Sequence, residues 1–261
     1  MLPRQELLQG CRHPTELEPL LRLVERVLRT WEPTWSPFLA PDLREEAETR
    51  LAALSELRLQ SDGGHPGAER RRLLLQRSET AAATPDLAAN LAGLEIAGNF
   101  LFDPADGEEF RAVLLATGAE EGDLGDLWLR GDRGARGIVT APLAAALDGR
   151  ESQVRSVPVR FEARPIEELQ APAPRTPRRL STVEASCRLD AVASAGFGLS
   201  RSRMAGLIRQ GAVRIDWQPV SSPSRELRVG ERVQLRDRGE LEILAIEPTK
   251  RERLRIALER R

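Results

Sequence analysis

The stretch from Arg188 to Trp217 constrains the fold most, because its apolar residues change period twice within a short span. A helical spacing of i, i+3, i+4 occurs in two sets, Leu189, Val192 and Ala193, and Met204, Leu207 and Ile208. Val213 and Ile215 then alternate with polar residues, as in a half-buried strand. The stretch therefore predicts two short helices followed by a strand.

Small residues mark the ends of these predicted helices. Ser186 or Thr182 can start the first helix, and Gly196 is expected to end it, because glycine readily adopts the left-handed backbone of a helix end. Ser200 is the expected N-cap of the second helix, since its hydroxyl can accept an otherwise unpaired backbone N–H. Gly211 is expected to end that second helix.

Arginine residues surround the second predicted helix. They are Arg188, Arg201, Arg203, Arg209 and Arg214. Helix N-termini favour anions and guanidinium forks match phosphate oxygens, so this arrangement predicts a phosphate-binding surface. The charges alone leave a second interpretation open, in which the arginines form the solvated face of a helical hairpin.

The order of residues in this stretch closely resembles the S4 RNA-binding domain. The matching residues are Arg188, Leu189, Asp190, Ser200, Arg201, Ser202, Arg203, Ala205, Leu207, Ile208, Gly211 and Val213. The resemblance implies that the two helices bind structured RNA at a backbone or a helix junction. The predicted RNA-binding residues are Arg188, Asp190, Ser200, Arg201, Ser202, Arg203, Arg209, Gln210, Arg214 and Trp217.

The chain departs from the S4 pattern at one turn. S4 domains commonly carry Asn-Gly in the hairpin after the strand, and Asp216 and Trp217 stand there instead. Trp rarely adopts a positive φ, so we expect a different or a longer turn. Two interpretations of Trp217 stay open: an exposed ring that stacks on a base, or a ring that covers the sheet against the preceding linker.

Charge is distributed unevenly along the chain. The formal net charge is −1, but residues 178–261 hold 18 basic and 11 acidic residues, a net of +7. Residues 1–177 hold 21 basic and 29 acidic residues, a net of −8. This asymmetry predicts that a polyanion binds the C-terminal third.

The expected fold class is α+β, and the sequence divides into three domains and a linker. A helical N-terminal domain (1–78) is followed by a ferredoxin- or RRM-like β-α-β-β-α-β middle domain (79–170). A Pro-rich linker (171–179) then leads to a small α+β S4 domain (180–261). In the N-terminal domain, a helix is expected to start at Asp42 and to carry apolar residues through Leu57. Trp31, Trp35 and Phe38 are expected to hold the helices together.

Strands of the middle domain are expected near 91–96, 125–130 and 135–140, with a helix opened by Asp103 or Pro104. RNA-recognition modules of this plan place aromatic residues on the central strands to stack bases. Trp128 is the one aromatic residue on the central strands here. We therefore expect a packing or docking domain, or one that contacts the RNA backbone, rather than a reader of sequence.

Two further motifs widen the resemblance to most of the chain. GGHPGAER at 63–70 and GDLWLR at 125–130, between a helical N-terminus and an S4 domain, resemble the YlmH family, whose cyanobacterial and plastid branch is called photosystem II S4 domain protein. The resemblance implies a ribosome-associated factor in translation or stalled-ribosome quality control, with ribosomal RNA and transfer RNA on the large subunit as partners. An assembly or interaction factor linked to photosystem II or cell division is the alternative.

An RNA-modifying enzyme with an S4 targeting domain is the second alternative. A pseudouridine synthase needs a larger sheet domain than this chain offers, and a methyltransferase needs a Gly-rich loop after its first strand. Acidic residues gather at one predicted helix start, where they offset the helix dipole: Asp103, Asp106, Glu108 and Glu109. His65 has no ligand partners at metal spacing, and Arg70–Arg72 suit either a secondary RNA contact or a solvated helix start. We predict no catalytic residue, metal or cofactor.

Location follows from what the sequence lacks. It contains no apolar run of 18 residues and no apparent signal peptide, and its two cysteines, Cys11 and Cys187, lie far apart. We expect a cytoplasmic protein with no membrane span and no recognition of DNA sequence.

Overall fold

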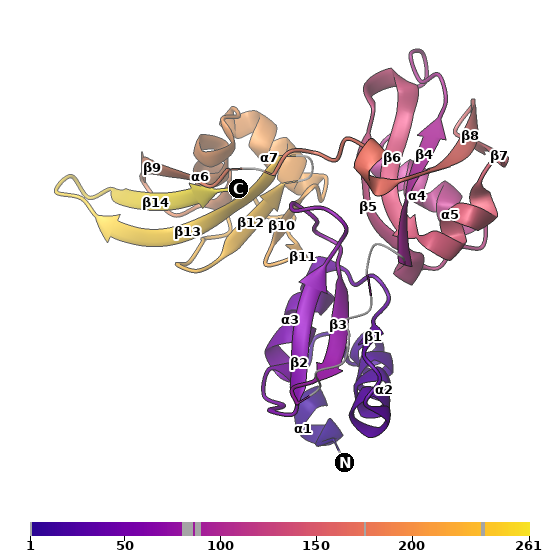
Figure 1. Cartoon of the computed structure of the whole chain (residues 1–261). Helices are drawn as coiled ribbons and strands as arrows, with labels where there is room; N and C mark the ends of the chain where they lie inside the picture. The colour runs from indigo at the N-terminus through magenta and orange to yellow at the C-terminus, as the bar shows by residue number, and fades with distance from the viewer. Residues whose placement is uncertain (1, 80–85, 87–89, 175, 236–237) are drawn as a thin grey trace. The chain divides into compact units, whose positions relative to one another are not determined.

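The computed structural model describes residues 2–79, 86, 90–174, 176–235 and 238–261 (Figure 1). The chain forms two compact units, Met1–Ala173 and Pro174–Arg261. Both mix helices with antiparallel strands, which confirms the α+β class. Among the described residues, no helix combines the length and apolar character needed to cross a membrane.

The N-terminal part of the first unit packs helices against a small sheet. Its elements are α1 (Arg4–Leu8), α2 (Pro14–Thr30), β1 (Thr34–Trp35), α3 (Pro41–Leu51), β2 (Leu57–Asp62) and β3 (Arg72–Arg77), with strand order β1-β3-β2. The buried face of α2 repeats at helical spacing and consists of Leu17, Leu20, Leu21, Val24 and Val27. Leu73 and Leu75 of β3 join these residues in one core.

Two expectations for this region are wrong. The helix expected through Leu57 ends at Leu51, and Leu57 begins β2. Arg72 begins a strand rather than following a helix start, because Leu73–Leu75 is an apolar run buried on both faces, where period alone cannot separate helix from strand. The helical N-terminal region is therefore confirmed, with a sheet added to it.

The aromatic residues expected to join these helices have separate places. Trp31 is 48% exposed and adopts a left-handed backbone, and the guanidinium carbon of Arg77 lies 3.8 Å from its ring centroid. Phe38 is buried in a different cluster, with Leu91, Ile138 and Leu169. Phe38 thus connects the N-terminal segment to the middle sheet rather than one helix to another.

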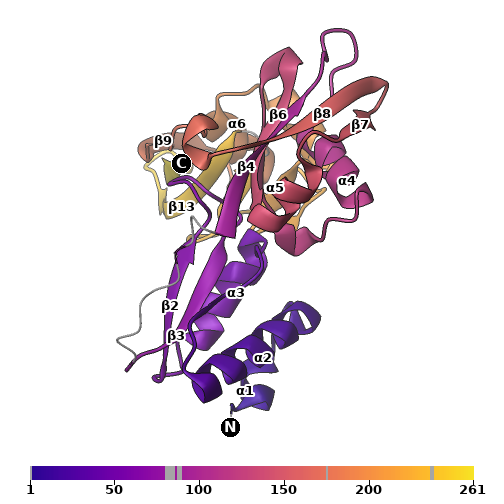
Figure 2. The same ribbon diagram turned by 45° about the vertical axis from the view of Figure 1, so that its right-hand side comes forward.

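The middle of the first unit has the expected order with one additional strand. Its elements are β4 (Leu91–Ala97), α4 (Gly107–Ala116), β5 (Leu124–Leu129), β6 (Gly134–Thr140), α5 (Ala141–Leu147), β7 (Glu151–Val154) and β8 (Val157–Arg164). All pairs are antiparallel in the order β5-β6-β4-β8-β7, so β7 extends the split βαβ sheet at one edge. Both helices pack on the same face of the sheet, and Phe110 and Leu147 contribute to that core (Figure 2).

The second unit has one six-stranded sheet covered on one face by two helices. Its elements are β9 (Arg178–Glu184), α6 (Leu189–Phe197), α7 (Arg201–Arg209), β10 (Val213–Ile215), β11 (Gln218–Pro219), β12 (Arg232–Leu235), β13 (Gly239–Pro248) and β14 (Leu254–Arg260). The strand order is β11-β10-β12-β13-β14-β9. The two helices and the strand predicted from apolar spacing are confirmed, because their apolar residues share one buried core.

Two details of the second unit correct the sequence analysis. Thr182 lies within β9, and the first helix takes its N-cap at Arg188, so neither Thr182 nor Ser186 starts it. Gly196 lies inside α6, which ends instead at Gly198 with φ +67°. A Cβ at Gly196 would lie 2.4 Å from a Leu241 methyl group, so this glycine allows the helix to approach β13.

Candidate nucleic-acid interface

The start of α7 is capped as the sequence predicts. Ser200 Oγ accepts a hydrogen bond from the backbone N–H of Arg203 at 3.3 Å and lies 3.3 Å from Ser202 Oγ. At the other end, Gly211 follows the helix with φ +75°. The cap leaves Ser200, Arg201 and Ser202 exposed on the first turn, where unpaired backbone N–H groups favour an anion.

Asp190 holds two of the predicted arginines. Its side chain is only 7% exposed, and both of its oxygens accept hydrogen bonds from Arg188, each at 3.1 Å. The same oxygens accept from Arg201 Nε at 3.0 Å and from Arg201 Nη2 at 3.2 Å. One carboxylate therefore orients two guanidinium groups, and the Nη1 groups of both arginines take no part in these contacts.

Electrostatics at Asp190 favour the ionised pair. Burial acts to raise the pKa of Asp190, but the hydrogen bonds from Arg188 and Arg201 outweigh it and leave the pKa below its ordinary value. The hydrogen bond to Asp190 raises the pKa of Arg188 in turn. Asp190 was predicted as an RNA-binding residue; the structure places it beneath the arginines, as their holder.

Three further predicted cations lie on the surface of the same unit. Arg203, Arg209 and Arg214 are exposed, and none of them forms an ion pair with a described residue. Gln210 is exposed beside Arg209 at the end of α7. Within the described part of the chain, no acidic side chain neutralises these arginines.

Gly206 is a feature of this surface that the sequence analysis missed. It lies four residues after Ser202 on α7, and no atom lies within 4 Å of a Cβ built on it. Glycine destabilises the interior of a helix, and no neighbouring atom requires a glycine at position 206 for packing. A helix surface without a side chain lets another backbone approach closely. The spacing of four residues from Ser202 was the sequence signal that Gly206 lies on the same face of α7.

The hairpin at Trp217 differs from the expected turn. Asp216 and Trp217 have φ +46° and +68°, and they form the two-residue turn between β10 and β11 that Asn-Gly normally forms. Asp216 accepts a hydrogen bond from the N–H of Arg232 at 3.1 Å, and the N–H of Trp217 donates to Gln234 Oε1 at 3.2 Å. These contacts to β12 stabilise the turn despite the bulky Trp, so the expectation of another turn type is wrong.

The Trp217 ring is half-buried rather than fully exposed. Its centroid lies 6.0 Å from the guanidinium carbon of Arg232, and its buried Nε1 has no hydrogen-bond partner among the described residues. The ring lies near Arg232 of β12, which favours packing on the sheet over stacking on a base, and the expected contact with the linker stays a prediction.

The GGHPGAER motif serves the first unit internally. Asp126 of β5 accepts hydrogen bonds from the N–H groups of Glu69 and Arg70 at 2.8 and 2.9 Å, and His65 Nε2 lies 3.0 Å from it. Arg70 donates to the carbonyl of Leu124 at 2.7 Å, and burial lowers the pKa of Arg70 to about 10. We call Asp126 and the loop 63–70 the clasp.

The clasp decides the alternatives left open for this motif. A Cβ at Gly63 would lie 2.4 Å from the Ala68 Cβ, so the turn requires glycine there. Within the described part of the chain, no group of three or more His, Cys, Asp or Glu residues could hold a metal ion. His65 lies in this turn against Asp126, and Arg70 donates to the carbonyl groups of Leu124 and Glu121.

The face of the middle sheet opposite its helices carries ion pairs. Trp128, Arg136 and Glu95 lie side by side across three strands, and Glu95 pairs with Arg136 at 3.1 Å and with Arg130. Trp128 meets the edge of His65 with ring centroids 5.9 Å apart. This face offers no row of aromatic platforms for bases.

The segment after β8 covers part of the same face. It contains the short helix η4 (Ile166–Glu168) and then Leu169, which is 1% exposed. A Cβ at Gly93 of β4 would lie 2.6 Å from Leu169, so the segment packs directly on the central strand. The position at which RNA-recognition modules stack bases is occupied by the protein's own chain.

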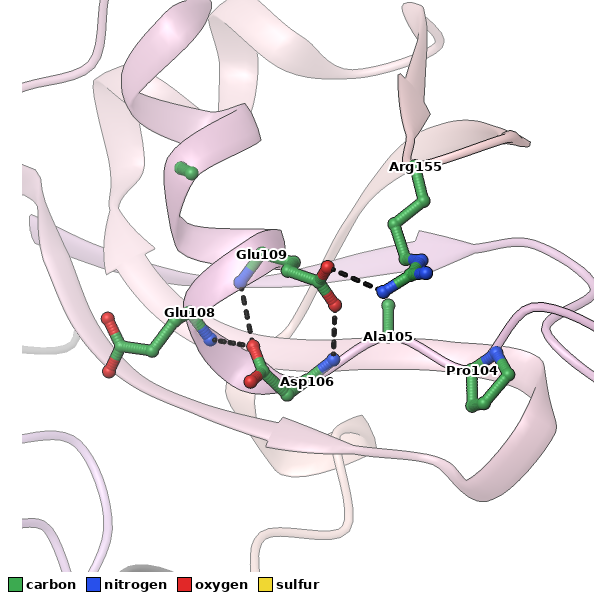
Figure 3. A pocket seen from close by; sticks show the side chains of 7 residues that line it. Pro104, Ala105, Asp106, Glu108, Glu109 and Arg155 are labelled. Atoms are coloured by element: carbon green, nitrogen blue, oxygen red, sulfur yellow. Dashed lines mark hydrogen bonds and ion pairs between the residues drawn. The ribbon is translucent and has the colours of Figure 1, made fainter. Parts of the chain in front are cut away.

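An open hollow of about 540 Å³ lies at the start of α4 (Figure 3). Asp106 accepts hydrogen bonds from the N–H groups of Glu108 and Glu109, and Glu109 accepts one from the N–H of Asp106 and another from Arg155. Asp106, not Asp103 or Pro104, is therefore the cap of this helix. These acidic groups serve the helix start, as the sequence analysis expected, and Asp103 binds Arg155 and Ser156.

Comparison with known proteins agrees with this geometry. Residues 13–80 match the family described as YlmH, N-terminal, and residues 187–233 match the S4 domain. A Bacillus subtilis (strain 168) protein named Ribosome-associated protein quality control protein P2 is 26% identical over 207 residues, 79% of each chain. Residues 13–80 thus resemble the N-terminal part of the YlmH family, and residues 187–233 resemble an S4 domain.

The two family-model matches lie in different units of the chain. The loop 63–70 lies within the match to YlmH, N-terminal, and Asp126 lies outside it; the capped helix, Asp190 and its arginines lie within the S4 match, which supports RNA binding by the second unit. A solved structure named Cell division protein ylmH from Streptococcus pneumoniae is 20% identical, with a TM-score of 0.46, covering 59% of this chain and 93% of that one. The cyanobacterial and plastid branch stays a prediction.

Proposed function

We propose that the protein binds ribosomal RNA on the large ribosomal subunit, with transfer RNA as a further partner, and acts as a ribosome-associated factor in translation or stalled-ribosome quality control. The observation that carries the proposal is the pair of guanidiniums held by Asp190, on the same unit as Arg203, Arg209 and Arg214, which form no ion pair with a described residue. The Bacillus relative, whose name places it with the ribosome, supports the ribosomal target.

The proposed contact is to phosphates rather than to base edges. Arginine forks bind phosphate oxygens, and the exposed start of α7 adds backbone N–H groups to the same surface. The half-buried Trp217 does not offer a free ring for stacking. Affinity is therefore expected to fall steeply as salt concentration rises, because bound cations on the RNA are released on binding.

The proposal includes no catalytic step, no cofactor and no metal, and it places the protein with cytoplasmic ribosomes. Each candidate acidic residue near the start of α4 already serves the helix cap or an ion pair. An RNA-modifying activity would require a site that these residues do not form.

Co-sedimentation with large ribosomal subunits tests the proposal. Arg203 and Arg214 are the residues to change, because Arg188 and Arg201 also neutralise the buried Asp190 and their loss would disturb the fold. The Arg203→Ala/Arg214→Ala variant is expected to leave the subunit fraction and keep its thermal stability. If the variant sediments with the subunits like the wild type, the assignment of Arg203 and Arg214 to the RNA-binding site is wrong.

A matched control and a ribonuclease arm separate the alternatives. Arg22→Ala/Arg29→Ala removes two exposed arginines from the first unit and is expected to sediment like the wild type. A partner that stays bound after ribonuclease treatment would favour a protein-assembly role, as in photosystem II or cell division. Crosslinking followed by sequencing then names the RNA.

A further inference from the structure

The β13–β14 ribbon carries a second basic surface outside the S4 match. The pairing of the two strands begins at Leu241 opposite Arg260 and ends at Pro248 opposite Leu254. Both strands lie beyond residue 233, where the S4 match ends. Figure 1 shows the turn of this ribbon projecting past the neighbouring strand β9. The ribbon therefore lies outside the matched segment, and its apolar side completes the core of the unit through Ile256.

Hydrogen bonds close the turn of the ribbon into one shape. The N–H of Thr249 donates to the carbonyl of Arg253 at 2.7 Å, and Thr249 Oγ1 accepts from the N–H of Arg253 at 3.2 Å. Glu252 adopts φ +55° within this turn. Side chains on a closed turn lose less freedom on binding than side chains on a loose loop.

Four cations cluster on and beside this turn: Lys250, Arg251, Arg253 and Arg255. All four are exposed, and none forms an ion pair with a described residue. Elsewhere in the unit, Arg225 pairs with Glu231 at 2.8 Å and Arg261 pairs with Glu259 at 2.6 Å. The unit thus neutralises many of its arginines internally but leaves the turn charged.

We propose that Lys250, Arg251, Arg253 and Arg255 form a second phosphate-binding surface, which contacts the backbone of the same RNA that α6 and α7 bind. This inference rests on the proposed function. Ammonium and guanidinium groups bind phosphates, and the turn carries no aromatic residue for base stacking. The contact reads RNA position and shape, not sequence.

Two contacts on one compact unit reinforce each other. Once the S4 helices are bound, the turn meets a nearby phosphate at a high effective concentration, so a contact that is weak alone strengthens the whole. The second surface also restricts the RNA to structures that present two backbone segments at the right separation. The ribbon would therefore add selectivity for a folded RNA over a simple duplex.

The test compares the salt dependence of RNA binding in the full-length protein, with purified bacterial large-subunit ribosomal RNA as the probe. Lys250→Ala/Arg251→Ala/Arg253→Ala is expected to lower affinity about tenfold and to reduce the slope of log affinity against log salt by about 2 to 3. The charge-preserving Arg251→Lys/Arg253→Lys variant is expected to bind like the wild type. Equal thermal unfolding of all variants checks that the exposed turn does not affect folding.

The controls separate failure of this inference from failure of the proposed function. Arg22→Ala/Arg29→Ala/Arg58→Ala removes three exposed arginines from the first unit and is expected to leave the slope unchanged. If Arg203→Ala/Arg214→Ala weakens binding but the turn variant keeps the wild-type affinity and slope, the inference is overturned and the proposed function stands. If the wild type itself shows no salt-dependent binding, both fail. Tighter binding by the turn variant would also overturn the inference.

Discussion

Asp126 and Asp190 organise the two units in different ways. Asp126 receives two backbone N–H groups and His65, and it fixes one part of the first unit to another. Asp190 receives two guanidiniums, which are 39% and 55% exposed at Arg188 and Arg201, and it prepares a surface. Asp126 holds the fold together, whereas Asp190 orients two arginines of the proposed RNA-binding surface, so a recognisable motif is not by itself a binding site.

Charge follows the same division. In the first unit Arg70 and Arg136 form hydrogen bonds to carbonyl groups or carboxylates of the chain itself. In the second unit Arg203 and the turn of the β13–β14 ribbon carry cations without such partners among the described residues. The acidic first unit uses its motif for cohesion, whereas the basic second unit keeps charge available for a polyanion.

The largest expected effect is on the clasp. Asp126→Ala leaves the N–H groups of Glu69 and Arg70 without their acceptor, and we expect the free energy of unfolding to fall by about 3 kcal/mol. Urea denaturation measures this change. The control Asp132→Ala removes an exposed carboxylate from the same unit and is expected to change stability by less than about 0.5 kcal/mol. A loss of RNA affinity in the folded variant, with no loss of stability, would contradict the division between the units.

The next effect is on the arginine holder. Asp190→Asn frees Arg188 and Arg201, and ordering two mobile side chains on binding costs about 1 kcal/mol each, so RNA affinity is expected to fall about tenfold or more. Fluorescence anisotropy with labelled ribosomal RNA measures this loss. Glu226→Gln removes an exposed negative charge from the same unit and is expected not to weaken binding. Equal weakening in both variants would show that Asp190 has no special role.

The lowered pKa of Asp190 makes a separate prediction about pH. Because the folded-state pKa lies below the ordinary value of about 3.9, the stabilisation from ionised Asp190 is complete above that value and is lost as the pH falls through the lowered pKa. The difference in unfolding free energy between the wild type and Asp190→Asn is therefore expected to be constant near neutral pH and to shrink in acid. Denaturation across an acid pH series measures it, and a constant difference throughout would contradict the assignment.

Gly206 allows stability and binding to change in opposite directions. Gly206→Ala has room for its methyl group, and we expect unfolding free energy to rise by about 0.5–1 kcal/mol. The same methyl group projects where RNA is proposed to approach, so RNA affinity is expected to fall. Thermal denaturation and anisotropy on the same sample measure both quantities. If the variant is more stable and binds RNA as well as the wild type, Gly206 is not part of the RNA interface.

The smallest expected effect is at Trp217. Trp217→Gly relieves a positive φ but loses the packing of the half-buried ring, so the two changes offset each other to within about 1 kcal/mol. RNA affinity is expected to stay near the wild-type value. An affinity loss of about 1 kcal/mol or more, the size expected for a lost base stack, would restore the stacking role.

Several features of the second unit could be predicted from the sequence because their determinants are local. The apolar spacing predicted α6, α7 and β10, and Ser200 marked the cap that the structure shows. Gly196 misled because a glycine at close helix–sheet contact looks the same in sequence as a glycine at a helix end. The turn at Trp217 was mispredicted because its stability comes from Arg232 and Gln234, which lie far along the chain.

The first unit was less predictable because its motif acts across long distances. His65 and Asp126 are 61 residues apart, so the spacing of GGHPGAER could not show that its loop closes on β5. The Leu73–Leu75 run could not reveal β3, because a segment buried on both faces has no strand period. The sequence indicated that Phe38 is buried, but it could not show that Phe38 packs with Leu91, Ile138 and Leu169, which lie far along the chain.

The sequence by itself determined the mixed helix–strand class, the position of the S4 helices and the excess positive charge after residue 178, because spacing, capping and composition act locally. Only the tertiary structure decided which charges remain available. Asp190 folds beneath Arg188 and Arg201, Asp126 folds onto the loop at 63–70, and the cations of the β13–β14 turn form no ion pair within the described part of the chain. Whether a charged side chain pairs within the chain or stays available to a partner depends on its distance from opposite charges, and that distance is set by tertiary packing.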